Sequence, residues 1–184
     1  MARIIAGTHR GRRLAAVPGT GTRPTSDRVK ESVFSRLESD DAILDAVVVD
    51  LFAGSGALGL EALSRGARRA ELVDRAEPAL KVLRRNAALF DDGRAQVHRA
   101  DVLRHLTRRE GEPVELLFLD PPYALSEPEL AAVLEASVVQ LHPAATVVVE
   151  RDARSPEPTW PQGLQGFQDR SYGSTRVWFA EPGP

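Results

Sequence analysis

The sequence contains no cysteine, and this excludes disulfides, thiolate zinc sites and a cysteine nucleophile. No apolar run approaches the roughly 20 residues that a helix needs to span a bilayer. The apolar stretch after Met1 is too short for a signal peptide. We therefore expect a cytoplasmic protein. We also expect no metal, because no metal-ligand spacing relates the four histidines, which are His9, His98, His105 and His142.

Charge is distributed unevenly along the 184 residues, whose net charge is −2. Residues 1–30 hold seven basic residues and one acidic residue, a net charge of +6 that leaves −8 on residues 31–184. A basic segment on an acidic body is typical of a protein that binds nucleic acid; the alternative is a solvated tail. The residues that we predict to contact the nucleic acid are Arg3, Arg10, Arg12, Arg13, Arg23 and Arg28.

The first 40 residues predict a basic N-terminal extension. Residues 3–6 and 13–17 flank a basic, glycine-containing tip, a pattern that predicts a short β-hairpin. Residues 27–39 carry apolar side chains at helical spacing, and Thr25 or Ser26 can cap that helix. We therefore divide the chain into an extension, residues 1–40, and a main domain, residues 41–184.

From residue 46 onward, strand and helix patterns alternate, which predicts an α/β fold with a mainly parallel sheet covered on both faces. Two further strands are so close in sequence that they must pair as a hairpin, giving the sheet an antiparallel edge. The expected strands are 46–52, 70–74, 95–100, 114–119, 145–150, 165–170 and 174–180, and the expected helices are 57–65, 77–89, 102–108 and 127–140.

A glycine-rich loop follows the first strand. Gly54, Gly56 and Gly59 match G-x-G-x-x-G, which lets the backbone approach a ligand near the start of a helix. Asp74 follows Gly54 by 20 residues and ends the second strand, where an acid can accept hydrogen bonds from a ribose. The loop therefore predicts an adenosine cofactor, but it does not choose between a dinucleotide and S-adenosylmethionine.

The charge of Asp50 favours S-adenosylmethionine, because it would repel a pyrophosphate and suits an ammonium and a sulfonium. Nothing obvious supplies the proton donor that a dehydrogenase needs. Asp101 can accept from the adenine amino group or cap the next helix, and both interpretations stay open. The predicted cofactor-binding residues are Asp50, Phe52, Ala53, Gly54, Ser55, Gly56, Gly59, Asp74, Arg75, Asp101 and Val102.

A second motif, Asp120-Pro121-Pro122-Tyr123, follows the apolar strand 114–119. The Asp120 carboxylate and the Pro121 carbonyl can accept the two hydrogens of an exocyclic base amine and direct its lone pair. The prolines make the loop stiff, and Tyr123 can stack on the base. These four residues are the predicted catalytic residues, and the pattern predicts methyl transfer to a nitrogen of a nucleic-acid base.

The combination of Arg23-Pro24-Thr25, Lys30-Glu31-Ser32 and the run from Asp50 to Ala67 resembles the bacterial 16S ribosomal RNA guanine-N2 methyltransferases of the RsmD type. The resemblance implies a class I (Rossmann-like) methyltransferase fold with a seven-stranded sheet. It also implies that S-adenosylmethionine is the cofactor and that guanine 966 of 16S rRNA, in the small ribosomal subunit, is the substrate. Family members often carry Glu and Phe where this chain has Asp74 and Tyr123, which keep the same chemistry.

Four other functions fit the sequence less well. DNA adenine-N6 and protein glutamine-N5 methyltransferases carry similar loops, but the chain lacks a long target-recognition insertion, and its basic extension does not suit a protein substrate. A non-catalytic RNA-binding module would not need both loops intact. A dehydrogenase is the weakest alternative.

Overall fold

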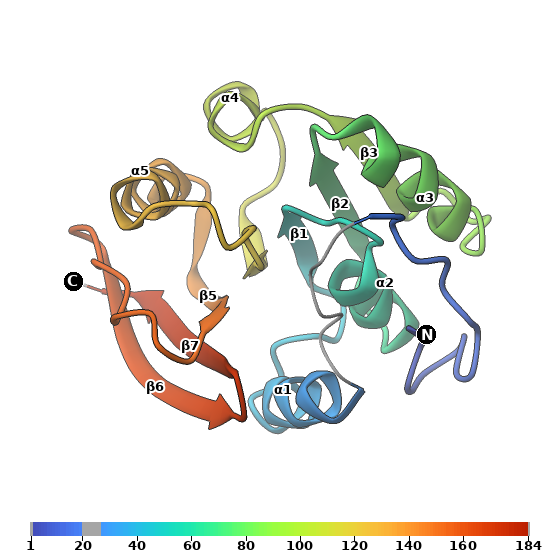
Figure 1. Ribbon diagram of the computed structural model, residues 1–184, viewed down its shortest axis with the longest axis horizontal. Helices are drawn as coiled ribbons and strands as arrows, with labels where there is room; N and C mark the ends of the chain where they lie inside the picture. The colour runs from blue at the N-terminus through green and yellow to red at the C-terminus, as the bar shows by residue number, and fades with distance from the viewer. Residues whose placement is uncertain (1, 20–26, 184) are drawn as a thin grey trace.

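A seven-stranded sheet forms the centre of the computed structural model, which describes residues 2–19 and 27–183 (Figure 1). The strand order is β3-β2-β1-β4-β5-β7-β6. Three helices cover one face and two cover the other, so the sheet is the middle of three layers. The first three are α1 (Asp27–Ser39), α2 (Ala57–Ser64) and α3 (Glu77–Ala87), and the other two are α4 (Val102–Arg108) and α5 (Glu127–Val138).

The first five strands are parallel, and β7 pairs antiparallel with both β5 and β6, which confirms the predicted sheet. The largest difference is at β5, which begins at Leu141, four residues before its predicted start. The first four residues of β5 include His142 and Pro143, and they lack the apolar pattern from which a strand is predicted. The strands are β1 (Val47–Leu51), β2 (Arg69–Asp74), β3 (Ala95–Arg99), β4 (Val114–Leu119), β5 (Leu141–Asp152), β6 (Leu164–Tyr172) and β7 (Thr175–Pro182).

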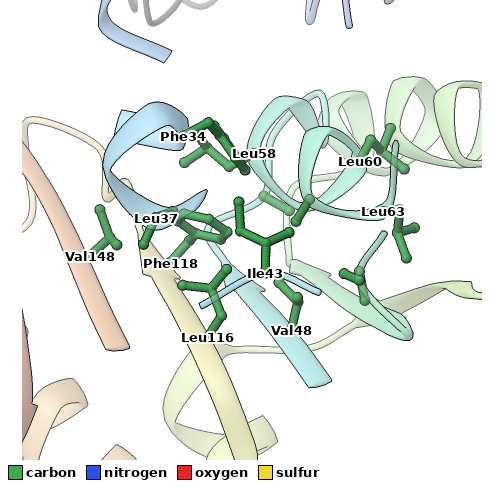
Figure 2. Packing of buried hydrophobic residues seen from close by; sticks show 14 of the residues in the cluster. Phe34, Leu37, Ile43, Val48, Leu58, Leu60, Leu63, Leu116, Phe118 and Val148 are labelled. Carbon is green, nitrogen blue, oxygen red and sulfur yellow. The ribbon is translucent and has the colours of Figure 1, made fainter. Parts of the chain in front are cut away.

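The core lies on both faces of β1 and β4, whose side chains are almost all buried. Such continuous burial is expected for parallel strands that helices cover on both sides. Figure 2 shows Phe34 and Leu37 of α1 packing over Phe118 and Leu116 of β4, and the Phe34 and Phe118 ring centroids are 5.6 Å apart. Helix α1 is therefore part of the main core, although we assigned it to the extension.

The described part of the N-terminal extension also packs into this core. Its two arms pair at one isolated bridge, Arg3↔Arg13, so the predicted hairpin is present without regular strands. Ile4 and Leu14 are 0% and 1% exposed and belong to the same cluster as α1 and α2. Residues 2–19 therefore form a docked segment, and the domain boundary at residue 40 stays a prediction.

No helix within residues 2–19 and 27–183 has the length and apolar character that crossing a membrane requires. The same ranges contain no group of three or more acidic or histidine side chains placed to hold a metal ion.

Candidate functional site at the carboxyl edge of the sheet

Strand register brings the two predicted motifs together. Leu51 at the end of β1 pairs with Val73 of β2 on one side and with Leu119 of β4 on the other. The next residue of β2 is Asp74, and the next residue after β4 is Asp120. The two acids therefore flank the glycine loop at the carboxyl edge, the place where ligands bind in open α/β sheets.

The three glycines of the loop have different structural roles. A Cβ at Gly56 would lie 2.7 Å from a Leu83 methyl carbon, and one at Gly59 would lie 2.3 Å from a Leu72 methyl carbon, so these two glycines allow α2 to pack closely. A Cβ at Gly54 would meet nothing nearer than the Phe52 carbonyl oxygen, at 3.9 Å. The space beside Gly54 is therefore open, and a ligand can approach the backbone there.

The backbone of this loop is held in an uncommon conformation. Phe52 has a φ of 62°, Gly54 of 56° and Gly56 of 81°, all in the left-handed region. A non-glycine residue there is strained, and such strain is concentrated at functional sites. The Phe52 side chain is partly buried and packs against the core on the α4 and α5 face. Packing of Phe52 thus helps to fix the loop in this shape.

Asp74 holds the loop from the neighbouring strand. Its carboxylate accepts from the Gly54 N–H and the Ala76 N–H, both at 2.9 Å. An ionised carboxylate offers about four lone-pair sites, so Asp74 retains acceptors for the hydroxyls of a ribose. The position and the remaining acceptors both suit the predicted ribose contact.

Asp101 caps α4, accepting from the Leu103 and Arg104 N–H groups at 3.1 and 3.3 Å. The capping interpretation is therefore confirmed. Its other carboxylate oxygen lies 3.4 Å from Arg75, so two predicted adenosine contacts are adjacent. Val102 is buried. The contact between Asp101 and the adenine amino group stays a prediction.

Asp50 lies beneath the glycine loop. Its side chain is buried, and its carboxylate accepts from the Gly59 N–H at 2.9 Å. Burial raises the pKa of Asp50 to about 7, and the nearby charges of Asp120 and Asp74 add to the effect of burial. The structure thus places Asp50 inside the fold. Its contact with a cationic cofactor stays a prediction.

The predicted catalytic loop is held at both ends. Pro121 is buried, and the Pro122 carbonyl accepts from the Leu125 N–H at 2.9 Å, which closes a turn. Arg151 donates to the Leu125 carbonyl at 3.1 Å. Tyr123 is 61% exposed, so its ring can stack on an incoming base.

Asn86 was not identified from the sequence, although it is buried next to the site. It donates to the Ser55 carbonyl at 2.8 Å and to the Ala15 carbonyl at 3.0 Å, and it accepts from the Ala15 N–H at 2.9 Å. A single side chain thus joins the glycine loop to the extension. The only signal in the sequence is an amide on the buried side of an amphipathic helix.

The predicted RNA-binding arginines lie in separate places. Arg10, Arg12 and Arg13 are exposed on the extension, and Arg3 pairs with Asp27 at 2.8 Å. The tip of the extension contacts the C-terminal ends of α2 and α3, through Ser64 and Leu89.

Arg28 is exposed at the start of α1 and lines a hollow of about 370 Å³ with the turn between β6 and β7. In that turn the Tyr172 hydroxyl lies 2.7 Å from the Ser32 hydroxyl. Arg23 lies outside the described residues, as do Thr25 and Ser26, the candidate caps of α1.

Comparison with known proteins places this chain in one family. The profile of a family described as "Conserved hypothetical protein 95" matches residues 2–181. Ribosomal RNA small subunit methyltransferase D of Escherichia coli strain K12 is 38% identical over 171 residues, which are 93% of this chain and 85% of that protein. Its counterpart in Haemophilus influenzae is 36% identical over 174 residues, 93% of this chain and 89% of that protein. The solved structure of yhhF from Escherichia coli superposes with a TM-score of 0.84 at 33% identity, covering 98% of this chain and 97% of that one.

Proposed function

Because this chain belongs to the RsmD-type methyltransferase family, to which proteins named ribosomal RNA small subunit methyltransferase D also belong, it is an S-adenosylmethionine-dependent ribosomal RNA methyltransferase, and we propose which nucleotide it methylates. The finer proposal is that the acceptor is the exocyclic N2 amine of guanine 966 of 16S rRNA, in the small ribosomal subunit. Such a substrate would place the protein in the cytoplasm. The observation that carries the proposal is the strand register that sets Asp74 and Asp120 on either side of the glycine loop.

The residues at the loop fit an adenosine cofactor with a sulfonium group. The open space beside Gly54 admits the ligand, and Asp74 has acceptors for the ribose. Arg75 and Asp101 border the position next to Asp74, where the adenine would lie. S-adenosylmethionine, when bound, supplies a methyl group that its sulfonium activates for transfer to a nucleophile.

The residues after β4 act on the other reactant, the base. An exocyclic amine is a weak nucleophile, because its lone pair is delocalised into the ring. Asp120 and the Pro121 carbonyl accept hydrogen bonds from its two N–H groups, which favours a pyramidal nitrogen with its lone pair directed at the methyl group. As the new nitrogen–carbon bond forms, the sulfur–methyl bond would break, S-adenosylhomocysteine would leave, and the nitrogen would give up one proton to the Asp120 carboxylate or to water. Tyr123 stacks on the base and fixes its plane. Positioning and electrostatic stabilisation account for most of the rate enhancement in this scheme.

The two acids are separated by two strand spacings, or about 10 Å, because β1 lies between β2 and β4. This span would leave room for a ribose at Asp74 and a base amine at Asp120. The same acceptor pair could hold the N6 amine of adenine, so an adenine-N6 methyltransferase is the second candidate.

The decisive experiment uses small ribosomal subunits from cells that lack the endogenous enzyme. The protein is incubated with these subunits and with S-adenosylmethionine labelled in its methyl group, and the RNA is then digested to nucleosides. We expect label in N2-methylguanosine, located at position 966. Label in N6-methyladenosine would support the second candidate, and absence of label from RNA would contradict the proposed function.

A further inference from the structure

A groove among the described residues lies at the edge of the sheet and extends beyond the site described above, which it meets at Arg75 and Asp101. It has a volume of about 880 Å³ and runs between the edge strand β3 and α4; we call it the β3–α4 groove. Its charge is strongly biased, since six arginines and three acids line it in a chain whose net charge is −2. The arginines are Arg69, Arg75, Arg99, Arg104, Arg108 and Arg109.

The groove exists because α4 leaves part of β3 uncovered. Helix α4 has only seven residues, and Gln96 and His98 of β3 line the groove as polar side chains. Its floor is fixed by Glu71, which lies 2.9 Å from Arg109 and 3.1 Å from His105. Arg109 thus has a structural partner, and the cations free to bind a ligand lie elsewhere in the groove.

Arg104 and Arg108 are the two most available cations. Both are exposed and four residues apart on α4, and neither forms an ion pair with any residue in the described ranges. Like charges at this spacing repel each other on a helix, and an anion between them would relieve the repulsion. Arg75 and Arg99 pair with Asp101 at 3.4 Å and Glu77 at 3.2 Å. Such exposed pairs contribute little, so phosphates could replace the acids.

We propose that the β3–α4 groove is a second RNA-contact surface, which binds backbone phosphates of the substrate on the cofactor side of the site. This inference rests on the proposed function. The groove reaches the carboxyl edge at Arg75 and Asp101, so it is continuous with the candidate cofactor site. Three strand spacings separate β3 from β4, or about 14 Å. At a rise of about 3.4 Å per stacked nucleotide, this is roughly four nucleotides from the target base.

The test compares two double variants with the same change in charge. Arg104→Gln with Arg108→Gln removes the two free cations of the groove. Lys81→Gln with Arg85→Gln is the matched control, because these residues are also exposed, four apart on α3 and without an ion pair among the residues described. For each protein, affinity for a 16S rRNA fragment is measured over a series of salt concentrations. Melting temperature and S-adenosylmethionine affinity are measured on the same samples.

The salt slope is the decrease in the logarithm of the RNA binding constant per unit logarithm of salt concentration. We expect this slope to be smaller by about 1.4 for the groove variant, because each single-stranded phosphate contact contributes about 0.7 to it. The control should keep the wild-type slope, and all three proteins should bind S-adenosylmethionine equally. Equal slopes for the two variants would overturn the proposal. So would weaker binding to whole subunits with an unchanged slope on RNA alone, which would indicate a ribosomal protein as the partner.

The outcome is separable from the proposed function. Slopes are measured by binding and need no methyl transfer, whereas the function is tested by the nucleoside that the wild-type protein produces. If the double variant melts at a lower temperature, Arg104→Gln alone should still lower the slope by about 0.7. An unchanged slope in that single variant would also overturn the proposal.

Discussion

Lys30 and Glu61 form an ion pair inside the protein, with the Lys30 Nζ 3.1 Å from the Glu61 Oε2 and both side chains at most 2% exposed. Glu61 also accepts from the N–H groups of Ile5 and Ala6, at 2.8 and 3.0 Å, and from Arg65 at 2.9 Å. One carboxylate on α2 therefore binds both α1 and residues 2–19 of the extension to the main domain.

The first prediction concerns this carboxylate. Glu61→Gln should lower the free energy of unfolding by about 3–5 kcal/mol, because it leaves the buried Lys30 without its anionic partner. Glu38→Gln is the control: Glu38 also pairs with Arg65, at 2.9 Å, but is 51% exposed, so its loss should cost under about 1 kcal/mol. Urea denaturation measures both, and similar values for the two variants would contradict this account of the buried pair.

The second prediction separates the extension's packing from its charge. Ile4→Ala should destabilise the protein by about 2–5 kcal/mol, because Ile4 is fully buried in the main core. Arg10→Gln with Arg12→Gln should leave the melting temperature unchanged, because both side chains are exposed. If the extension binds RNA, the arginine variant should flatten the salt dependence of RNA binding. An unchanged slope would limit the extension to a structural role.

The third prediction follows from the burial of Asp50. Its pKa rises from 3.8 to about 7 on folding, so between these values the unfolded chain loses a proton that the folded protein keeps. The contribution of Asp50 to the stability of the wild-type protein should therefore fall as pH rises from about 4 to 7. Asp50→Asn can still accept from Gly59 and lacks this titration. Its stability relative to the wild type should rise by up to about 4 kcal/mol between pH 4 and pH 8.

Thermal or urea denaturation of both proteins across this pH range tests the sign and the size of the change in their relative stability. A constant difference between Asp50→Asn and the wild type would show that the Asp50 pKa is not raised in the folded protein.

The fourth prediction concerns the candidate ribose contact. Asp74→Ala should weaken S-adenosylmethionine binding by about 1.5–3 kcal/mol, because charge-assisted hydrogen bonds to the ribose are lost. It also removes the acceptor of the Gly54 N–H, so melting temperature must be measured alongside calorimetry. RNA affinity should not change. Intact cofactor affinity in a folded variant would remove Asp74 from the site.

Much of this architecture could be predicted from local sequence patterns. The limits of α1 and β4 were predicted correctly, because an amphipathic stripe and an apolar run mark them clearly. The positions of Asp74 and Asp120 followed as well, since both acids directly end apolar strands. Parallel strands in one sheet then bring those ends to the same edge.

Other features depend on contacts between distant segments, which no local pattern encodes. The role of Glu61 requires α1, α2 and the extension to meet, and the role of Asn86 requires Ala15 to reach Ser55. The β3–α4 groove arises because β3 is the last strand of the sheet and α4 is short. In the sequence, nothing distinguishes Arg104 and Arg108 from other solvent-exposed residues of a helix.

The central claim is that the loop after β4 performs the chemistry while the glycine loop and Asp74 hold the cofactor. The most direct measurement is single-turnover methylation of small subunits by Asp120→Ala, with S-adenosylmethionine affinity measured by calorimetry on the same preparation. The account predicts a rate about 100- to 1000-fold below wild type, as for the loss of one preorganised polar group, with cofactor affinity nearly unchanged. A near-normal rate, or a loss of rate that weaker cofactor binding explains, would contradict it.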